Sequence, residues 1–241
     1  LLDKGIDVNI KNDNGMTPLH FAVTNYTFRD DHLNMVRLLV ARGAAIDAKD
    51  HMGRTPLNVV THMIMMSSEE NPPQYRIVRF LIDKGADINA KHEDGWTALH
   101  WAIGTSQKDL VELLIAKGAK INSSDWKGET PLYWAVHRHV DAVKELSMNG
   151  SVINAVTKNQ GPVDIELVRQ TMRPFYLTIS NTLKDVVKLL IAKGADVNAK
   201  NRDGDTALIE AAKGADKELV ELLVASSADV NAKGKDGLTA V

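Results

Sequence analysis

Short apolar segments alternate with polar turns along the chain. Between residues 97 and 118, an apolar segment at 99–103 precedes apolar side chains at 110, 111, 114 and 115, the i, i+1, i+4, i+5 spacing of one helical stripe. Thr97 is placed to cap the first helix, and in matching segments Pro18, Pro56 and Pro131 take the first helical position. Gly118 is placed to end the second helix in the left-handed conformation. The pattern predicts a turn and two antiparallel helices, too small to bury their own stripe.

This unit recurs along the chain. A threonine followed by proline or alanine and often by leucine, with a glycine two positions before it, returns at Thr17, Thr55, Thr97, Thr130, Thr206 and Thr239. A second phrase, Gly-Ala-x-Ile/Val-Asp/Asn, returns in step with it at Gly43, Gly85, Gly118 and Gly194. Undisturbed copies are 33 residues apart. A fixed period of this length predicts a stacked array of small units, not one globular core.

The two phrases together resemble the ankyrin repeat over essentially the whole chain. The resemblance implies an all-α solenoid of stacked helix-turn-helix units with β-hairpin-like loops, whose hairpin tips and inner helices form a concave binding face. It also implies that His20 and His100 bond to backbone and to the motif threonine, which is a structural role.

We expect a single ankyrin-repeat domain over residues 1–241. Its predicted parts are a partial repeat 1–10, repeats 11–48 and 49–90 with insertions, repeats 91–123 and 124–156, a degenerate repeat 157–199 with an insertion, a repeat 200–232 and a partial repeat 233–241. Because the chain opens and stops inside a repeat, we interpret it as a fragment or as the ordered part of a longer protein.

Three insertions lengthen the period, to 38 residues between Thr17 and Thr55, 42 between Thr55 and Thr97, and 43 between Val163 and Thr206. Each is expected between the two helices of a unit, at residues 26–30, 63–74 and 171–181. Three interpretations are open: the insertions are surface loops whose length varies at little cost in free energy, loops that contact a partner, or extensions of a helix that pack on a neighbouring unit. The degraded motif at 161–166 and the polar helix end at 144–147 predict the least regular stacking between about Val140 and Asn181.

Composition narrows the possible functions. A formal net charge of -2 gives no reason to expect nucleic acid or a membrane surface as partner. With no cysteine, disulfides, thiolate zinc sites and cysteine nucleophiles are excluded. No apolar run approaches the roughly 18 residues of a membrane-spanning helix. An intracellular, cytoplasmic location fits this composition.

Candidate catalytic and metal-binding groups follow the repeat. His137 and His139 are two residues apart and do not face each other on a helix, so we expect no metal site there. The acids recur at turns and outward helix positions, and no Gly-x-Ser-x-Gly or phosphate-binding loop occurs. Lysines recur before the turns, but acids in the same turns disfavour phosphate tracking. We therefore expect no catalytic residue, no cofactor and no small-molecule substrate.

The aromatic residues are the sharpest functional signal. All four tryptophans lie between residues 96 and 134. Trp101 and Trp134 hold the same repeat position and are expected side by side on inner helices, as packing or as contact residues. Trp96 and Trp126 lie at hairpin turns, where exposure is expected. Tryptophan and tyrosine dominate interface hot spots. The predicted partner-binding residues are Trp96, Trp126, Trp101, Trp134, Tyr133, His137, Arg138, Arg54, Lys127 and Glu129.

These features predict a non-catalytic scaffold that binds a partner protein through its concave face. The alternative is a substrate-targeting module of a larger enzyme or effector whose catalytic domain lies outside this sequence. A monomer is expected, although end units that stack on other copies would allow end-to-end association.

Overall fold

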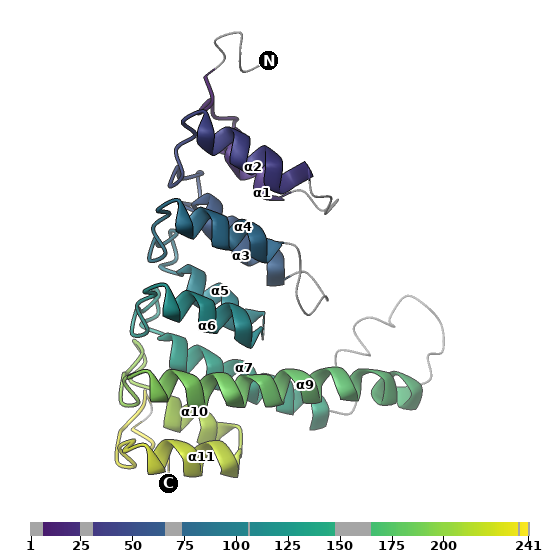
Figure 1. The fold of residues 1–241 in the computed structure, drawn as a ribbon. Helices are drawn as coiled ribbons and strands as arrows, with labels where there is room; N and C mark the ends of the chain where they lie inside the picture. The colour runs from purple at the N-terminus through teal and green to yellow at the C-terminus, as the bar shows by residue number, and fades with distance from the viewer. Residues whose placement is uncertain are drawn as a thin grey trace. The chain divides into compact units, whose positions relative to one another are not determined.

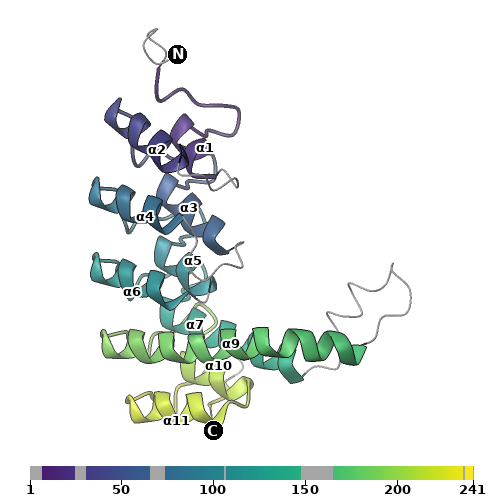
Figure 2. The same cartoon turned by 45° about the vertical axis from the view of Figure 1, so that its right-hand side comes forward.

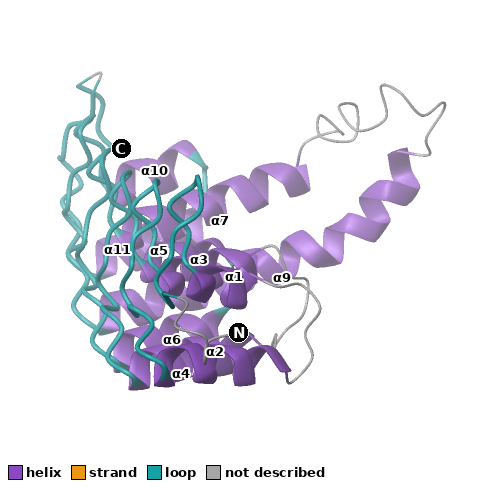
Figure 3. Ribbon diagram, turned by 90° about the horizontal axis from the view of Figure 1, so that it is seen from above, coloured by secondary structure: helices purple, strands orange, loops and turns teal. Residues whose placement is uncertain are grey.

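The computed structural model describes residues 7–24, 31–65, 74–105, 107–147, 165–235 and 237–240. Within these ranges the chain consists of helices joined by turns and loops, with no β-strand (Figure 3). The chain divides into two compact units, Leu1–Trp126 and Lys127–Val241. The all-α repeat architecture predicted from the sequence is confirmed.

Unit 1 stacks three antiparallel helix pairs. Each pair has an inner helix that begins just after a motif threonine and an outer helix that follows it. Contacts run within the pairs and between the neighbouring inner helices α1, α3 and α5 (Figures 1 and 2). The helices are α1 (Pro18–Thr24), α2 (Asp31–Ala41), α3 (Pro56–Met65), α4 (Gln74–Asp83), α5 (Ala98–Gly104) and α6 (Lys108–Ala116).

The predicted helix boundaries are confirmed in detail. α1 and α3 begin at Pro18 and Pro56. At α5, Thr97 and His100 form a reciprocal capping box that satisfies backbone donors at the helix start. Gly118 has a φ of +96°, the left-handed conformation expected after α6. The repeated residues are therefore the ones whose backbone conformation each unit requires.

Successive hairpin tips of unit 1 are joined by one backbone hydrogen bond each. The amides of His51, Glu93 and Trp126 donate to the carbonyls of Asn14, Met52 and Asp94 over 3.0, 3.0 and 2.8 Å. The recurring lysines reinforce this stacking. The ammonium groups of Lys11 and Lys91 donate to the carbonyls of Lys49 and Ser124, over 2.8 and 2.6 Å. Lysine at this position thus links successive repeats of unit 1.

The described residues of unit 2 form two helix pairs of unequal length. α7 (Pro131–Ser147) packs along α9 (Ile165–Ala192), while α10 (Ala207–Lys213) pairs with α11 (Lys217–Ala225). α7 and α10 are the neighbouring inner helices. Figure 3 shows the α7–α9 pair extending beyond the ends of α10 and α11, as an arm of unit 2.

The predicted degenerate repeat 157–199 is not a separate pair of helices in its described part. Residues 165–192 form one continuous helix that runs through Pro174, where two helices and a connecting insertion at 171–181 were expected. The amide of Arg202 donates to the carbonyl of Lys127 over 2.7 Å, so the hairpin before α7 contacts the hairpin before α10 directly. Residues 131–147 and 165–192 therefore supply one long helix pair, because residues 171–181 continue α9 instead of forming a rim loop.

The other two insertions are described only in part. Residues 26–30 and 66–73 lie outside the described residues. Met63 and Ile64 belong to α3, and the Ile64 side chain is completely buried. The start of the second insertion thus lengthens an inner helix and fills the core of unit 1.

Candidate partner-binding site

The tryptophans of unit 1 form part of an aromatic cluster between α3, α5 and the hairpin before α5. Trp101 projects from α5, and its ring centroid lies 4.5 Å from that of Trp96, with an interplanar angle of 57°. His62 of α3 and His92 of the hairpin lie 4.4 and 5.6 Å from Trp101. Tilted and stacked rings at these separations attract one another beyond the area they bury. Trp101 therefore contacts two imidazoles as well as the Trp96 ring.

Trp126 is the most exposed tryptophan. Its side chain is 49% exposed at the hairpin tip that closes unit 1. Trp96 differs from the expectation of a solvated indole. It is half-buried, stacks 6.1 Å from His100, and its indole N–H donates to the Asp125 carboxylate over 3.1 Å. Trp96 thus supports the cluster, while Trp126 presents a large apolar surface beside Asp125.

The electrostatic environment of this cluster favours neutral histidines. Burial, followed by the Arg54 charge, lowers the pKa of His62. Burial also lowers the pKa of His92, against the opposing effect of Asp94 and Glu93. Arg54 is itself held by Asp50, with the guanidinium 2.7 and 2.8 Å from one carboxylate oxygen. Arg54, expected to contact a partner, is therefore already paired within its own hairpin.

His20 and His100 occupy the structural position that the repeat motif implied. The Thr17 amide donates to His20 Nδ1 over 3.1 Å, and His20 Nε2 donates to the carbonyl of Arg54 in the next repeat over 3.1 Å. The Thr97 amide donates to His100 Nδ1 over 3.2 Å. Both imidazoles are buried, and each fixes the start of its helix.

In unit 2, Tyr133 and His137 of α7 converge on Glu210 of α10. The Tyr133 hydroxyl donates to Glu210 Oε2 over 3.2 Å, and His137 Nδ1 donates to Oε1 over 2.8 Å. The hydrogen bond to Glu210 raises the pKa of His137, although burial acts in the opposite direction. The same bond lowers the pKa of Glu210, and burial beside Glu210 raises the pKa of Tyr133. The group is an internal ionic network between two inner helices.

This network corrects the interpretation of Tyr133 as a partner-contacting residue. Tyr133 is only 6% exposed, and it takes the motif position that histidine fills in α1 and α5. Its hydroxyl reaches the neighbouring helix, so it contributes to stacking. Trp134 is more accessible and stacks on His137, with the ring centroids 5.4 Å apart at 16°.

The two closely spaced histidines of α7 diverge as expected. His137 also lies 3.4 Å from Asp141, whereas His139 is fully buried between Asp216, 2.7 Å away, and the Ser180 carbonyl, 2.9 Å away. His139 therefore ties α7 to α9 and to the start of α11. In the part of the chain that the structure describes, no cluster of three or more acids and histidines could hold a metal.

The remaining predicted site residues are distributed over unit 2. Lys127 is exposed at the hairpin tip and Glu129 is half-buried beside it. Arg138 lines a groove of about 610 Å³ with Phe175 and Tyr176, between α7 and the arm of α9. The expected alignment of Trp101 with Trp134 joins residues of different units and stays a prediction.

Sequence reasoning missed Glu210, Asp125, His62 and His92. For Glu210, the signal in the sequence is its position in the repeat. Glu210 lies four residues after its motif threonine, at the position that Trp101 and Trp134 occupy in their repeats. An acid at a position that carries large apolar side chains in other repeats indicates a partner within reach. None of the described helices combines the length and apolar character that crossing a bilayer requires.

Comparisons with known proteins agree with this geometry. A family model described as "Ankyrin repeats (3 copies)" matches residues 63–157 and 160–241, and another, "Ankyrin repeats (many copies)", matches residues 1–60. Among solved structures, the ankyrin repeat domain of Bcl-3, a member of the IκB protein family, is similar with a TM-score of 0.66 and 28% identity. The match covers 99% of this chain and 82% of that one.

Curated relatives match over shorter segments. A putative ankyrin repeat protein of Rickettsia felis is 40% identical over 57 residues, which is 24% of this chain and 25% of the relative. An ankyrin repeat-containing protein of Schizosaccharomyces pombe is 41% identical over 58 residues, 24% of this chain and 26% of the relative. The matched segments thus span about a quarter of these relatives. Repeat motifs, helix pairs and family models agree across the sequence, and the chain belongs to the ankyrin repeat family.

Proposed function

We propose that this protein is a non-catalytic scaffold that binds a partner protein through the concave face formed by its hairpin tips and inner helices. Ankyrin repeats are in general protein–protein interaction modules. The observation that supports a site in unit 1 is the half-exposed indole of Trp126 at a hairpin tip, on the same hairpin as Asp125, which holds Trp96.

The proposed site combines an exposed anchor with a rigid support. Trp126 offers a large apolar area with few rotatable bonds, which lowers the entropic cost of binding. Trp96, Trp101 and the flanking imidazoles contact one another in tilted and stacked arrangements, so a partner would meet a preorganised aromatic surface.

The test is affinity capture from a native lysate with the wild-type chain, Trp126→Ala and Trp96→Ala/Trp126→Ala, scored by quantitative proteomics. Phe175→Ala is the matched control, because Phe175 is similarly exposed (53%) but lies on the α9 arm. We expect at least one protein to be lost with both tryptophan variants and kept with Phe175→Ala. Truncating an interface hot spot costs about 2 kcal/mol or more, roughly a thirtyfold loss of affinity.

If the double variant is destabilised, the Trp126→Ala variant alone is used for the comparison. The Trp126 side chain is exposed, and its removal leaves the contact between the Trp96 and Trp101 rings in place. Equal recovery of every captured protein by wild type and Trp126→Ala would show that this indole is not part of the binding site.

A further inference from the structure

The outer helices carry a charged residue at one recurring position whose sign changes from repeat to repeat. The position lies inside the apolar stripe and is exposed in every described copy. It is occupied by Arg37 in α2, Arg79 in α4, Glu112 in α6, Lys188 in α9 and Glu221 in α11. Because the same fold accepts either sign, stacking does not explain two consecutive arginines in α2 and α4.

The acidic copies of this position are paired within their own helices, and the arginines are not. Glu112 and Glu221 lie 3.9 and 3.6 Å from lysines four residues earlier. Four residues before Arg37 and Arg79 the chain has Leu33 and Tyr75. The one acid a helical turn after them, Asp83, is held by Lys117 at 2.8 Å. Lys117, and after it the Arg79 charge, lowers the pKa of Asp83. Among the described residues, neither Arg37 nor Arg79 forms an ion pair with a carboxylate of its own.

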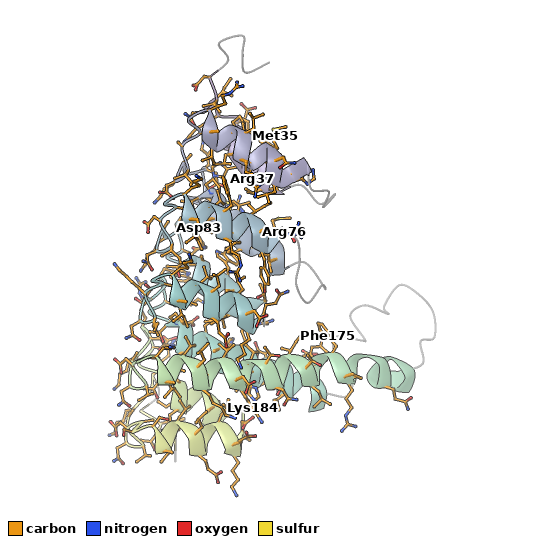
Figure 4. All side chains as sticks on the ribbon, viewed as in Figure 1. Met35, Arg37, Arg76, Asp83, Phe175 and Lys184 are labelled. Atoms are coloured by element: carbon orange, nitrogen blue, oxygen red, sulfur yellow. The ribbon has the colours of Figure 1, made fainter. Side chains whose placement is uncertain are left out.

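These arginines border an apolar strip formed by Met35, Leu38 and Phe80. The strip and the two arginines together are here called the α2–α4 surface, defined by Met35, Arg37, Leu38, Arg79 and Phe80. Met35 and Leu38 are 48% and 41% exposed. The Arg37 guanidinium carbon lies 5.9 Å from the centre of the Phe80 ring, which joins α2 to α4. Figure 4 shows Met35 and Arg37 projecting from α2. Exposed methionine and aromatic side chains beside arginine are enriched at protein interfaces.

We infer that the α2–α4 surface docks an acidic amphipathic helix of a partner protein. Carboxylates match the planar guanidinium groups, and apolar side chains between them would cover Leu38 and Phe80. Packed helices lie about 8–10 Å apart. Glutamates at i and i+7 of a helix are separated by about 10.5 Å and would reach one arginine on each outer helix. Leucines at i+3 and i+4 would then face the apolar strip.

A peptide fits this surface better than an anionic bilayer does. Each basic residue near an anionic membrane contributes about 1 kcal/mol. Arg37, Arg79 and the neighbouring Lys84, which lies 5.8 Å from the Phe80 ring, would contribute about 3 kcal/mol together, which gives only marginal adsorption. The surface is separate from the aromatic cluster of the hairpins, so this inference does not depend on the proposed function.

The test uses the full 241-residue chain and a fluorescein-labelled synthetic helical peptide with glutamates at i and i+7 and leucines at i+3 and i+4. Binding is measured by fluorescence anisotropy at two salt concentrations. We expect Arg37→Glu/Arg79→Glu to weaken binding about tenfold or more, because two exposed ion pairs are replaced by repulsion. Arg37→Gln/Arg79→Gln, a milder change that preserves helix propensity, should weaken it severalfold.

Two controls isolate the surface. Lys188→Glu changes the sign at the same repeat position in unit 2, and Trp96→Ala/Trp126→Ala alters the aromatic cluster; both should bind the peptide as the wild type does. A peptide with glutamine at i and i+7 should bind wild type about as weakly as the glutamate peptide binds Arg37→Gln/Arg79→Gln, because both combinations remove the ion pairs without adding repulsion.

Three results would overturn the inference. They are absence of binding to the glutamate peptide, equal binding by wild type and both arginine variants, and equal losses in Lys188→Glu. Sedimentation with phosphatidylserine vesicles that depends on Arg37 and Arg79, without peptide binding, would assign the surface to a membrane instead.

Discussion

The Glu210–His137 pair of unit 2 gives a quantitative test of how its inner helices are held together. Glu210 is buried and accepts the His137 proton over 2.8 Å. A hydrogen bond to a charged group is worth about 1.5–3 kcal/mol. Because the His137 side chain is 34% exposed, solvent screening should reduce the coupling to about 1–2 kcal/mol. The perturbations are Glu210→Gln and His137→Gln, separately and together.

The pH dependence of this coupling follows from opposite pKa shifts. The pKa of His137 is raised above 6.5 in the folded state, so its stabilisation is fully present below pH 6.5 and is lost as pH rises through the raised value. The pKa of Glu210 is lowered below 4.5, so its contribution is present above pH 4.5 and is lost as pH falls through the lowered value. Both groups are charged between these limits, and the coupling should be largest near pH 5.5.

The assay is urea denaturation of the four proteins at pH 5.5 and pH 9, followed by circular dichroism. The double-mutant cycle isolates the pair. We expect its coupling energy at pH 9 to fall to about 0.5–1 kcal/mol, because the imidazole is then neutral and only its hydrogen bond to the Glu210 carboxylate remains. Lys217–Glu221, an exposed pair on α11, is the control and should give about 0.5 kcal/mol or less at both pH values. A Glu210–His137 coupling near zero at pH 5.5, or equal at both pH values, would refute the reasoning.

Two further predictions concern unit 1 and the histidines. In urea denaturation, Gly95→Ala should destabilise the chain by at least about 1 kcal/mol more than Gly118→Ala. Both glycines have positive φ, but a Cβ at Gly95 meets Asp125 Cα at 3.0 Å, whereas a Cβ at Gly118 meets nothing within 4 Å. Equal losses of stability in the two variants would contradict this. In an NMR titration, His62 should titrate below pH 6.5 and His137 above it, and the reverse order would contradict the structure. Because the pKa of His62 is lowered in the folded state, protonation of His62 destabilises the fold as pH falls below 6.5.

The sequence was sufficient to predict the regular repeats because their signals are local. A proline at a helix start, a capping threonine and a glycine with positive φ each act within a few residues of their own position. α9 could not be predicted in this way. Counting along the repeat places an insertion at 171–181 between two helices, and Pro174 within it removes a helical hydrogen bond and normally breaks a helix. Packing along α7 over many residues instead keeps α9 continuous, and that contact is invisible to a pattern confined to one repeat.

The candidate site could be predicted from the sequence only where the exposure of a residue does not depend on a contact with another repeat. The exposure of Trp126 follows from its place at a hairpin tip, whereas Trp96 is half-buried because Asp125, 29 residues away, binds its indole. Tyr133 is buried because Glu210 lies 77 residues further along the chain. In an array, residues separated by one period or more become neighbours, so a substitution at one repeat position changes the environment of another repeat.

The two proposed surfaces can be separated because the fold constrains them differently. At the inner-helix position four residues after the motif threonine, Phe21 is 51% exposed while Val59 is buried, so a large apolar residue there does not by itself indicate contact. At the outer-helix position of Arg37 and Arg79, every described copy is exposed and only the charge varies. A partner that needs Trp126 but not the arginines uses the hairpin face, and the opposite dependence assigns it to the outer helices. Loss of binding in both sets of variants would require one partner that contacts both faces of unit 1.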